Sequence, residues 1–246
     1  MTVLGLPNGI TACLFDLDGV LTQTAKVHDE AWKQTFDAYL RKRDGENFKP
    51  FDKDSDYDEY VDGLPRYDGV RNFLKSRGIE LPEGRHDDSP QTDTVSGIGN
   101  RKNDLVLELI RRNGVQPYDG SVRYVKAARD AGLRRAVVSS SANCRDVLIA
   151  AGIESLFEAR IDGNVADERR LKGKPAPDTF LAGAQALGVQ AAQACVFEDA
   201  LAGVQAGRDG HFGFVVGVDR VGQAQALREH GASVVVSDLD ELLSAE

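Results

Sequence analysis

Cysteine is scarce in this 246-residue sequence, and long apolar runs and an excess of positive charge are missing. The three cysteines, Cys13, Cys144 and Cys195, cannot all pair with one another, and Cys13 and Cys195 stand within apolar runs. We therefore expect buried thiols in a reducing compartment, which excludes a disulfide framework or a cysteine-rich metal cluster.

Membrane and nucleic-acid partners are also excluded by what the sequence lacks. No stretch approaches the roughly 18 apolar residues of a membrane helix, and the N-terminal segment resembles no secretory signal, so we expect a cytoplasmic protein. Lysine and arginine number 30 against 39 acidic residues, a net charge of −9, whereas nucleic-acid binding needs a cationic surface. Binding of a small phosphate needs only a few local cations and stays open.

Five short apolar runs rich in β-branched residues indicate strands, and none alternates between polar and apolar positions. They are residues 12–17, 135–140, 194–198, 214–218 and 233–236. Helical patterns lie between them, over residues 121–131, 143–151 and 177–187. Asn143 is the expected N-cap of the second of these helices. The alternation predicts an α/β fold with a doubly wound, Rossmann-like parallel sheet.

Residues 25–115 look different, because they carry helical patterns without strands. His28, Trp32 and Phe36 are spaced four apart, which places them on one helical face. Further helices are expected around residues 70–74 and 106–110, the last with Asn103 as its cap, and residues 41–62 and 82–99 read as polar loops. We expect a discontinuous core of residues 1–24 and 116–246, interrupted by a small α-helical cap domain of residues 25–115.

The segment FDLDGVL at residues 15–21 follows the first apolar run. It places Asp16 and Asp18 at the carboxyl end of a parallel strand, where open α/β sheets bind ligands. Carboxylates this close repel unless a cation lies between them or one keeps a proton for acid–base chemistry. The alternative is an acidic turn that merely ends the strand.

Polar groups suited to phosphate chemistry follow at three later points of the chain. The serines of residues 139–143 open a helix and offer an anion site, and Lys174 lies in a proline-rich loop before another helix. Glu198 and Asp199 end a buried strand and offer the oxygen ligands that Mg²⁺ prefers. Each of these segments alone could be an ordinary helix cap, a solvated lysine or a pair of acids. Their occurrence together favours a single phosphate-binding site.

Four segments together resemble the haloacid dehalogenase superfamily of phosphotransferases over nearly the whole chain: FDLDGVL, the serine after VVS, KPAPD and FEDALAGVQAG. Within it, TQTAKVHDEAWK, Arg66, RKND and SSSAN resemble the β-phosphoglucomutase family. The resemblance implies Mg²⁺ as cofactor, Asp16 as the nucleophile that becomes an aspartyl-phosphate, and Asp18 as general acid and base. A halide-displacing dehalogenase does not use a second aspartate at this spacing, so Asp18 argues for phosphate.

The resemblance also implies binding residues. It assigns metal binding to Asp16, Asp18 (through its backbone carbonyl), Glu198 and Asp199. It assigns phosphate and substrate binding to Thr24, His28, Trp32, Arg66, Lys102, Ser139, Ser141, Asn143 and Lys174.

The inserted segment decides between a mutase and a phosphatase, because a mutase must exclude water and hold a second, distal phosphate. Arg66 is the best candidate for that phosphate, since a guanidinium binds it bidentately, and Lys102 is the second. The alternatives are that both are solvated surface cations and that His28 and Trp32 only form a helix core.

Several positions in the insertion depart from the mutase pattern. Gln23 stands where the family usually has an acid, Asp62 where a lysine is common, and Pro65 where a small polar residue is usual. Residues 82–99 also differ from the helical stretch expected there.

We expect a monomeric enzyme that acts on a small sugar phosphate. The resemblance implies that it interconverts β-glucose 1-phosphate and glucose 6-phosphate through glucose 1,6-bisphosphate. One alternative is a phosphatase acting on a small sugar phosphate or a phosphoglycolate-like substrate. Another is a non-catalytic binding protein on the same fold.

Overall fold

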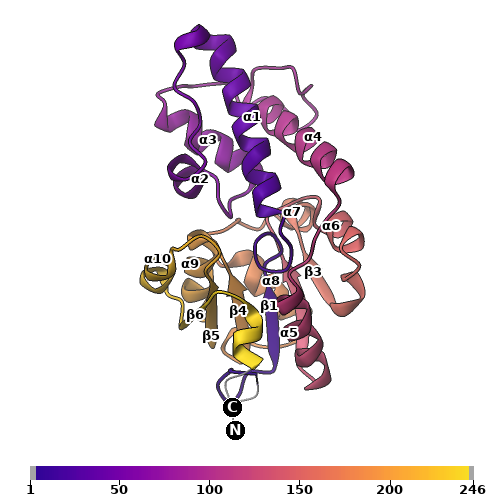
Figure 1. Ribbon diagram of the computed structural model, residues 1–246. Helices are drawn as coiled ribbons and strands as arrows, with labels where there is room; N and C mark the ends of the chain where they lie inside the picture. The colour runs from indigo at the N-terminus through magenta and orange to yellow at the C-terminus, as the bar shows by residue number, and fades with distance from the viewer. Residues whose placement is uncertain (1–3, 244–246) are drawn as a thin grey trace. The chain divides into compact units, whose positions relative to one another are not determined.

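A computed structural model describes residues 4–243, and the chain forms two compact units (Figure 1). Residues 1–23 and 115–246 form one, here called the core unit, and residues 24–114 form the other, the inserted unit. Within the described residues, no helix combines the length and the apolar character needed to cross a membrane.

A six-stranded parallel sheet with the order β3-β2-β1-β4-β5-β6 organises the core unit. Its strands are β1 (Ala12–Phe15), β2 (Arg134–Val138), β3 (Ala159–Ile161), β4 (Ala194–Glu198), β5 (Phe214–Val218) and β6 (Val234–Val236). The order runs outward from β1 on both sides, which confirms the predicted doubly wound parallel sheet. Strand β3 was missed, because its three residues include Arg160 and give no apolar run.

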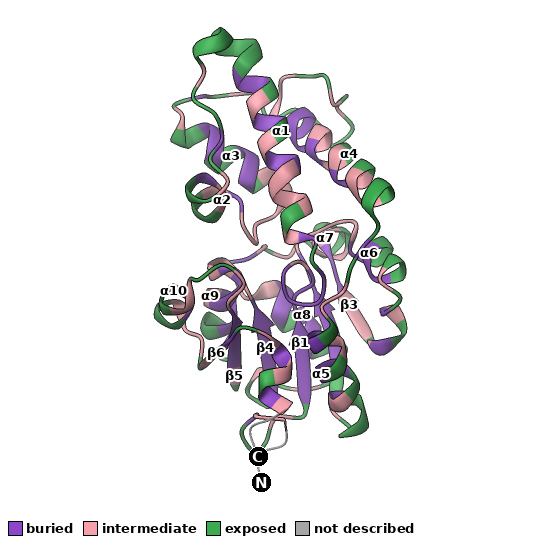
Figure 2. Cartoon of the chain, in the orientation of Figure 1, coloured by how far each residue is buried: buried purple, intermediate pink, exposed green. Residues whose placement is uncertain are grey.

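Helices cover both faces of this sheet, which explains why its strands do not alternate. They are α5 (Asp119–Asp130), α6 (Cys144–Ala150), α7 (Gly163–Arg169), α8 (Asp178–Ala186), α9 (Leu201–Asp209) and α10 (Ala224–His230). On one face, Gly183 of α8 lies so close to the sheet that a Cβ there would be 2.7 Å from Leu14. On the other, the rings of Phe15 and Phe197 stack at 4.4 Å and Tyr124 of α5 meets Phe197 at 5.3 Å. Figure 2 shows the central strands as buried.

The inserted unit is helical, as predicted, but its helices are not all where the sequence placed them. They are α1 (Ala25–Asp44), α2 (Ser55–Tyr60), α3 (Arg66–Ser76) and α4 (Val95–Asn113). Helix α2 lies in a stretch expected to be a loop. Helix α4 begins well before Asn103, so the predicted cap is wrong: the side chain of Thr94 accepts from the N–H of Gly97 at 2.9 Å and caps the helix.

Both connections to the inserted unit leave the core unit side by side. The N–H of Tyr118 donates to the carbonyl of Leu21 at 2.9 Å, and the N–H of Gln23 donates to the carbonyl of Gln116 at 2.9 Å. Thr22 and Pro117 form an antiparallel bridge between these bonds. Residues 21–23 and 116–118 therefore form a two-stranded ribbon, here called the linker ribbon.

Candidate active site

Lys174 brings the two acidic strand ends together at the carboxyl edge of the sheet. Its ammonium donates to Asp16 Oδ1 at 2.5 Å, to Glu198 Oε1, and to the carbonyl of Val138 at 3.3 Å. Lys174 is only 2% exposed. Burial alone lowers the pKa of Lys174, but the carboxylates of Asp16 and Glu198 outweigh burial and raise the pKa above its usual value. The lysine therefore stays charged beside both acids.

Asp16, Glu198 and Asp199 form a carboxylate cluster whose oxygens come within 4.8 Å of one another. Burial raises the pKa of Glu198 to about 7, with Lys174 lowering it and Asp16 raising it further. Its second oxygen, Oε2, accepts the N–H of Ala200 at 2.9 Å. Asp18 lies in the loop after β1, outside this cluster of three.

Two glycines make room for this cluster. A Cβ on Gly19 would lie 1.7 Å from Asp199 Oδ2, and a Cβ on Gly203 would lie 1.8 Å from Glu198 Oε1. The donors are all oxygen atoms, and the Lys174 ammonium contacts two of the three carboxylates. Such a set fits a hard divalent cation such as Mg²⁺, which Asp16, Glu198 and Asp199 would hold.

The serine-rich loop after β2 lies near the carboxylate cluster. Lys174 contacts the cluster and also donates to the carbonyl of Val138, the residue directly before Ser139. Its hydroxyls organise its backbone: Ser139 Oγ accepts the N–H of Ser141 at 3.1 Å, and Ser141 Oγ accepts the N–H of Asn143 at 3.2 Å. Asn143 occupies the N-cap position of α6 as predicted. The Asn143 side chain makes no capping bond to the helix, and Ser141 fixes Asn143 through its backbone N–H.

Three predicted residues of the inserted unit also come together. The Lys102 ammonium on α4 lies 2.8 Å from His28 Nδ1 on α1 and 4.6 Å from the centre of the Trp32 ring. Burial, and then the charge of Lys102, lower the pKa of His28 well below its usual value, so the imidazole is neutral. Lys102 is 5% exposed, so it is not a solvated surface cation. Thr24 directly precedes α1.

Arg66, the first residue of α3, is held by two residues that sequence reasoning missed. Its guanidinium lies 4.8 Å from the Tyr67 ring centre and donates to the Tyr67 hydroxyl at 3.0 Å. That hydroxyl donates to Asn100 Oδ1 at 2.9 Å. Arg66 Nε is buried and has no hydrogen-bond partner among the described residues. Gly99 makes room for this contact, since a Cβ there would lie 2.7 Å from the Tyr67 ring, but no motif in the sequence marks Tyr67 or Asn100 as part of the site.

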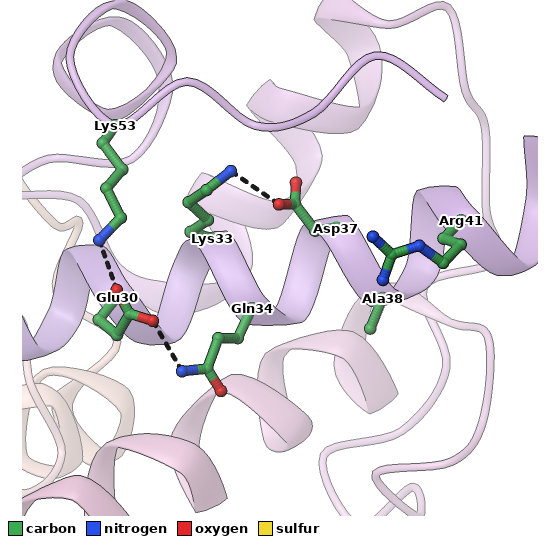
Figure 3. A pocket seen from close by; sticks show the side chains of 7 residues that line it. All are labelled: Glu30, Lys33, Gln34, Asp37, Ala38, Arg41 and Lys53. Carbon is green, nitrogen blue, oxygen red and sulfur yellow. Dashed lines mark hydrogen bonds and ion pairs between the residues drawn. The ribbon is translucent and has the colours of Figure 1, made fainter. Parts of the chain in front are cut away.

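A hollow on the inserted unit lies along α1, and none of the predicted site residues lines it (Figure 3). It is lined by Glu30, Lys33, Gln34, Asp37, Ala38, Arg41 and Lys53. Most of its charges are paired within it, since Lys33 binds Asp37 at 2.7 Å and Lys53 binds Glu30. It therefore adds no residue to the candidate site.

Comparison with known proteins agrees with this geometry. The sequence model of haloacid dehalogenase-like hydrolases matches residues 10–211. The chain belongs to the haloacid dehalogenase-like hydrolase family. β-Phosphoglucomutases of Mycobacterium tuberculosis and Mycobacterium bovis are each 57% identical to it over 247 residues, which cover 98% of this chain and 94% of the relative.

Two solved structures share the fold. A β-phosphoglucomutase from Clostridium difficile matches with a TM-score of 0.74 and 25% identity, over 95% of this chain and 93% of that one. A hydrolase from Pseudomonas syringae matches with a TM-score of 0.77 and 21% identity, over 96% and 97% of the two chains. Within its family the chain groups with the β-phosphoglucomutases, which confirms the resemblance seen in the sequence. It is an enzyme of the phosphotransferase class, and the non-catalytic alternative is wrong.

Proposed function

We propose that this enzyme interconverts β-glucose 1-phosphate and glucose 6-phosphate through an aspartyl-phosphate on Asp16 and a glucose 1,6-bisphosphate intermediate. The observation that carries the chemistry is the buried ammonium of Lys174 between Asp16 and Glu198, beside the carboxylate cluster. The substrate follows from the mycobacterial relatives, which are β-phosphoglucomutases at 57% identity.

The core unit performs the phosphoryl transfer. A carboxylate oxygen of Asp16 bonds to phosphorus while the bond from phosphorus to the sugar oxygen breaks, and Asp18 gives a proton to that oxygen. Lys174 and the Ser139 hydroxyl bind the transferring phosphoryl oxygens. Asp16, Glu198 and Asp199 would hold Mg²⁺, which would supply further positive charge against the developing negative charge. The free 6-hydroxyl of a β-glucose 1-phosphate takes the phosphoryl group from phosphorylated Asp16 and loses its proton to Asp18, which forms glucose 1,6-bisphosphate. Transfer of the 1-phosphoryl group of this intermediate back to Asp16 then releases glucose 6-phosphate.

The inserted unit recognises the substrate. Arg66 binds the distal, non-reacting phosphate, and its buried, unpartnered Nε is a donor suited to a phosphate oxygen. His28, Trp32 and Lys102 contact the sugar phosphate from one cluster, in which a neutral imidazole accepts a hydrogen bond from an ammonium. Arg66 and Lys102 supply the positive charge for a second phosphate, which a mutase needs and an enzyme that binds only one phosphate does not.

We place this reaction in the cytoplasm and in a monomer. Cys13, Cys144 and Cys195 are free and buried in the described chain, which suits a reducing compartment. Light scattering with the intact protein tests the monomer.

Phosphorus and proton NMR of one reaction mixture test the proposal. The mixture contains β-glucose 1-phosphate, Mg²⁺ and a catalytic amount of glucose 1,6-bisphosphate, and Asp16→Asn is the matched control. We expect glucose 6-phosphate to accumulate well ahead of free phosphate, and neither product to form with Asp16→Asn. Accumulation of free phosphate without isomerisation would identify a phosphatase with the same core residues.

A further inference from the structure

Arg220 follows β5 and binds the loop that carries Asp18. Its Nε donates to the carbonyl of Gly19 at 3.0 Å. Its NH1 donates to the carbonyl of Ser237 at 2.6 Å and forms an ion pair with Asp238 at 3.0 Å. The guanidinium also lies 3.7 Å from the centre of the Tyr118 ring, and the side chain is only 14% exposed. Arg220 is thus fixed on several sides while one N–H reaches the active-site loop.

The peptide of Gly19 is where this loop meets the carboxylate cluster. Strand β1 ends at Phe15, and the loop beyond it closes through bonds from the N–H groups of Leu21 and Thr22 to the carbonyl of Leu17, each 2.9 Å. Gly19 adopts a φ of +92°, and a Cβ there would overlap the Asp199 carboxylate. The backbone at Gly19 therefore packs closely against the Asp199 carboxylate and directly follows Asp18.

The same loop that carries Arg220 also binds Asp199. The Asp219 carboxylate accepts backbone N–H groups of residues 221–224 at 2.7 to 3.2 Å, which fixes the loop. Gln223 Nε2 then donates to the backbone carbonyl of Asp199 at 3.1 Å. Residues 219–223 therefore hold the carbonyl that follows Asp18 and the carbonyl of Asp199 at once.

We propose that Arg220 and Gln223 are positioning residues that fix the general acid and base, Asp18, relative to the metal ligand Asp199. The inference rests on the proposed function for the roles of these two acids. A guanidinium suits this task because its planar fork directs several N–H groups at fixed angles, whereas a lysine offers a single mobile ammonium. Small displacements matter, since about 1 Å of misplacement can lower a rate about 100-fold.

Four variants of the full chain test this: Arg220→Ala, Arg220→Lys, Gln223→Ala and the control Arg123→Ala. Arg123 lies on α5 in the same unit and has an exposed ion pair with Asp240. With saturating Mg²⁺, we expect Arg220→Ala to lower kcat about 100-fold and to change KM for the sugar phosphate less than about threefold. Gln223→Ala should lower kcat about tenfold, and Arg220→Lys should recover only part of the loss.

Three further measurements separate positioning from a structural role. Mn²⁺ binding, followed by electron paramagnetic resonance without substrate, should weaken at least threefold in Arg220→Ala and Gln223→Ala, and hydrogen exchange should rise in residues 16–23. Added guanidinium at non-denaturing concentration should restore part of the kcat of Arg220→Ala. Arg123→Ala should match the wild type in all assays.

The inference would be overturned if folded Arg220→Lys and Gln223→Ala lost thermal stability but kept the wild-type kcat, Mn²⁺ affinity and hydrogen exchange in the loop. These two variants decide the matter if Arg220→Ala does not fold. A wild type without phosphoryl transfer would refute the proposed function alone, because Mn²⁺ affinity and loop exchange would still support or overturn the positioning role.

Discussion

The ammonium of Lys174 lies 2.5 Å from the carboxylate of Asp16, although 158 residues separate the two in the sequence. The parallel sheet makes this approach possible. Asp16 directly follows β1, and Lys174 donates to the carbonyl of Val138, the last residue of the neighbouring strand β2. Both side chains are buried, so the pair interacts with little screening by water. In the proposed reaction, this cation neutralises the nucleophile before it approaches a dianionic phosphate.

Replacing the nucleophile should abolish turnover and leave the fold intact. We expect Asp16→Asn to retain less than about 1% of wild-type activity, because an amide cannot attack phosphorus. Glu198 still faces Lys174 in this variant, so the unfolding temperature should change little. Asp130→Asn, at the exposed end of α5, is the control. A barrier increase below about 2.7 kcal/mol in Asp16→Asn would contradict the assignment.

Removal of divalent metal should inactivate the enzyme reversibly. We expect activity to vanish after treatment with EDTA and to return with Mg²⁺, because three clustered carboxylates need a cation to approach a phosphate. Ca²⁺ should inhibit, since its larger and looser coordination misplaces the attacking carboxylate. Asp199→Ala should behave like chelated wild type even in excess Mg²⁺. Full activity after exhaustive chelation, checked by elemental analysis, would rule out the metal role.

Arg66→Ala should separate isomerisation from hydrolysis. A desolvated, bidentate contact to phosphate is worth about 2 to 4 kcal/mol, so we expect kcat/KM of the mutase reaction to fall roughly 30- to 1,000-fold. Release of phosphate from an aryl phosphate should persist, because that substrate has no distal phosphate. Arg66→Lys should rescue only partly, since it keeps the charge but loses the fork.

If Arg66→Ala lowers the rates of both reactions by the same small factor, Arg66 is an ordinary surface cation. Tyr67→Phe refines the test, because it removes the hydroxyl that binds Arg66 and Asn100 but keeps the ring against which Arg66 packs. We expect a loss of about 3- to 10-fold in the mutase reaction alone.

His28 should make the protein less stable in mild acid. Burial and Lys102 lower its pKa in the folded state well below the unfolded value of about 6.5, so folding favours the neutral ring. Stability is then full above about pH 6.5 and falls as the pH decreases. The loss grows steadily as the pH decreases from about 6.5. The unfolding free energy of His28→Gln, measured by urea from pH 8 to 5, should fall less steeply; parallel curves would contradict the pKa shift.

Much of the core unit could be predicted because buried strands leave uninterrupted apolar runs in the sequence. The apolar run before Asp16 predicts β1 and places the acidic pair at its end. Strand β3 has Arg160 at its centre, so the sequence there contains no apolar run. The start of α4 was missed for a different reason. Gly97 reads as a helix breaker, yet it is required there, since a Cβ would lie 2.2 Å from the carbonyl of Thr92.

The residues that support the candidate site could not be predicted, because their contacts follow no local period. Tyr67 and Asn100 are 33 residues apart, and Arg220 and Gly19 are 201 residues apart. Each of these contacts depends on how whole elements pack. Acidic residues at strand ends can be recognised in the sequence, because the topology of a parallel sheet alone gathers them at one edge.

The linker ribbon allows residues 24–114 to be replaced as one segment. Residues 24–114 begin and end on neighbouring strands of one antiparallel ribbon, joined by the bonds from Tyr118 to Leu21 and from Gln23 to Gln116. A short turn can close a ribbon of this kind, so residues 24–114 can be excised or exchanged for the helices of another protein without rerouting the sheet. Under the proposed function, substrate choice is then a graftable module on a fixed catalytic frame.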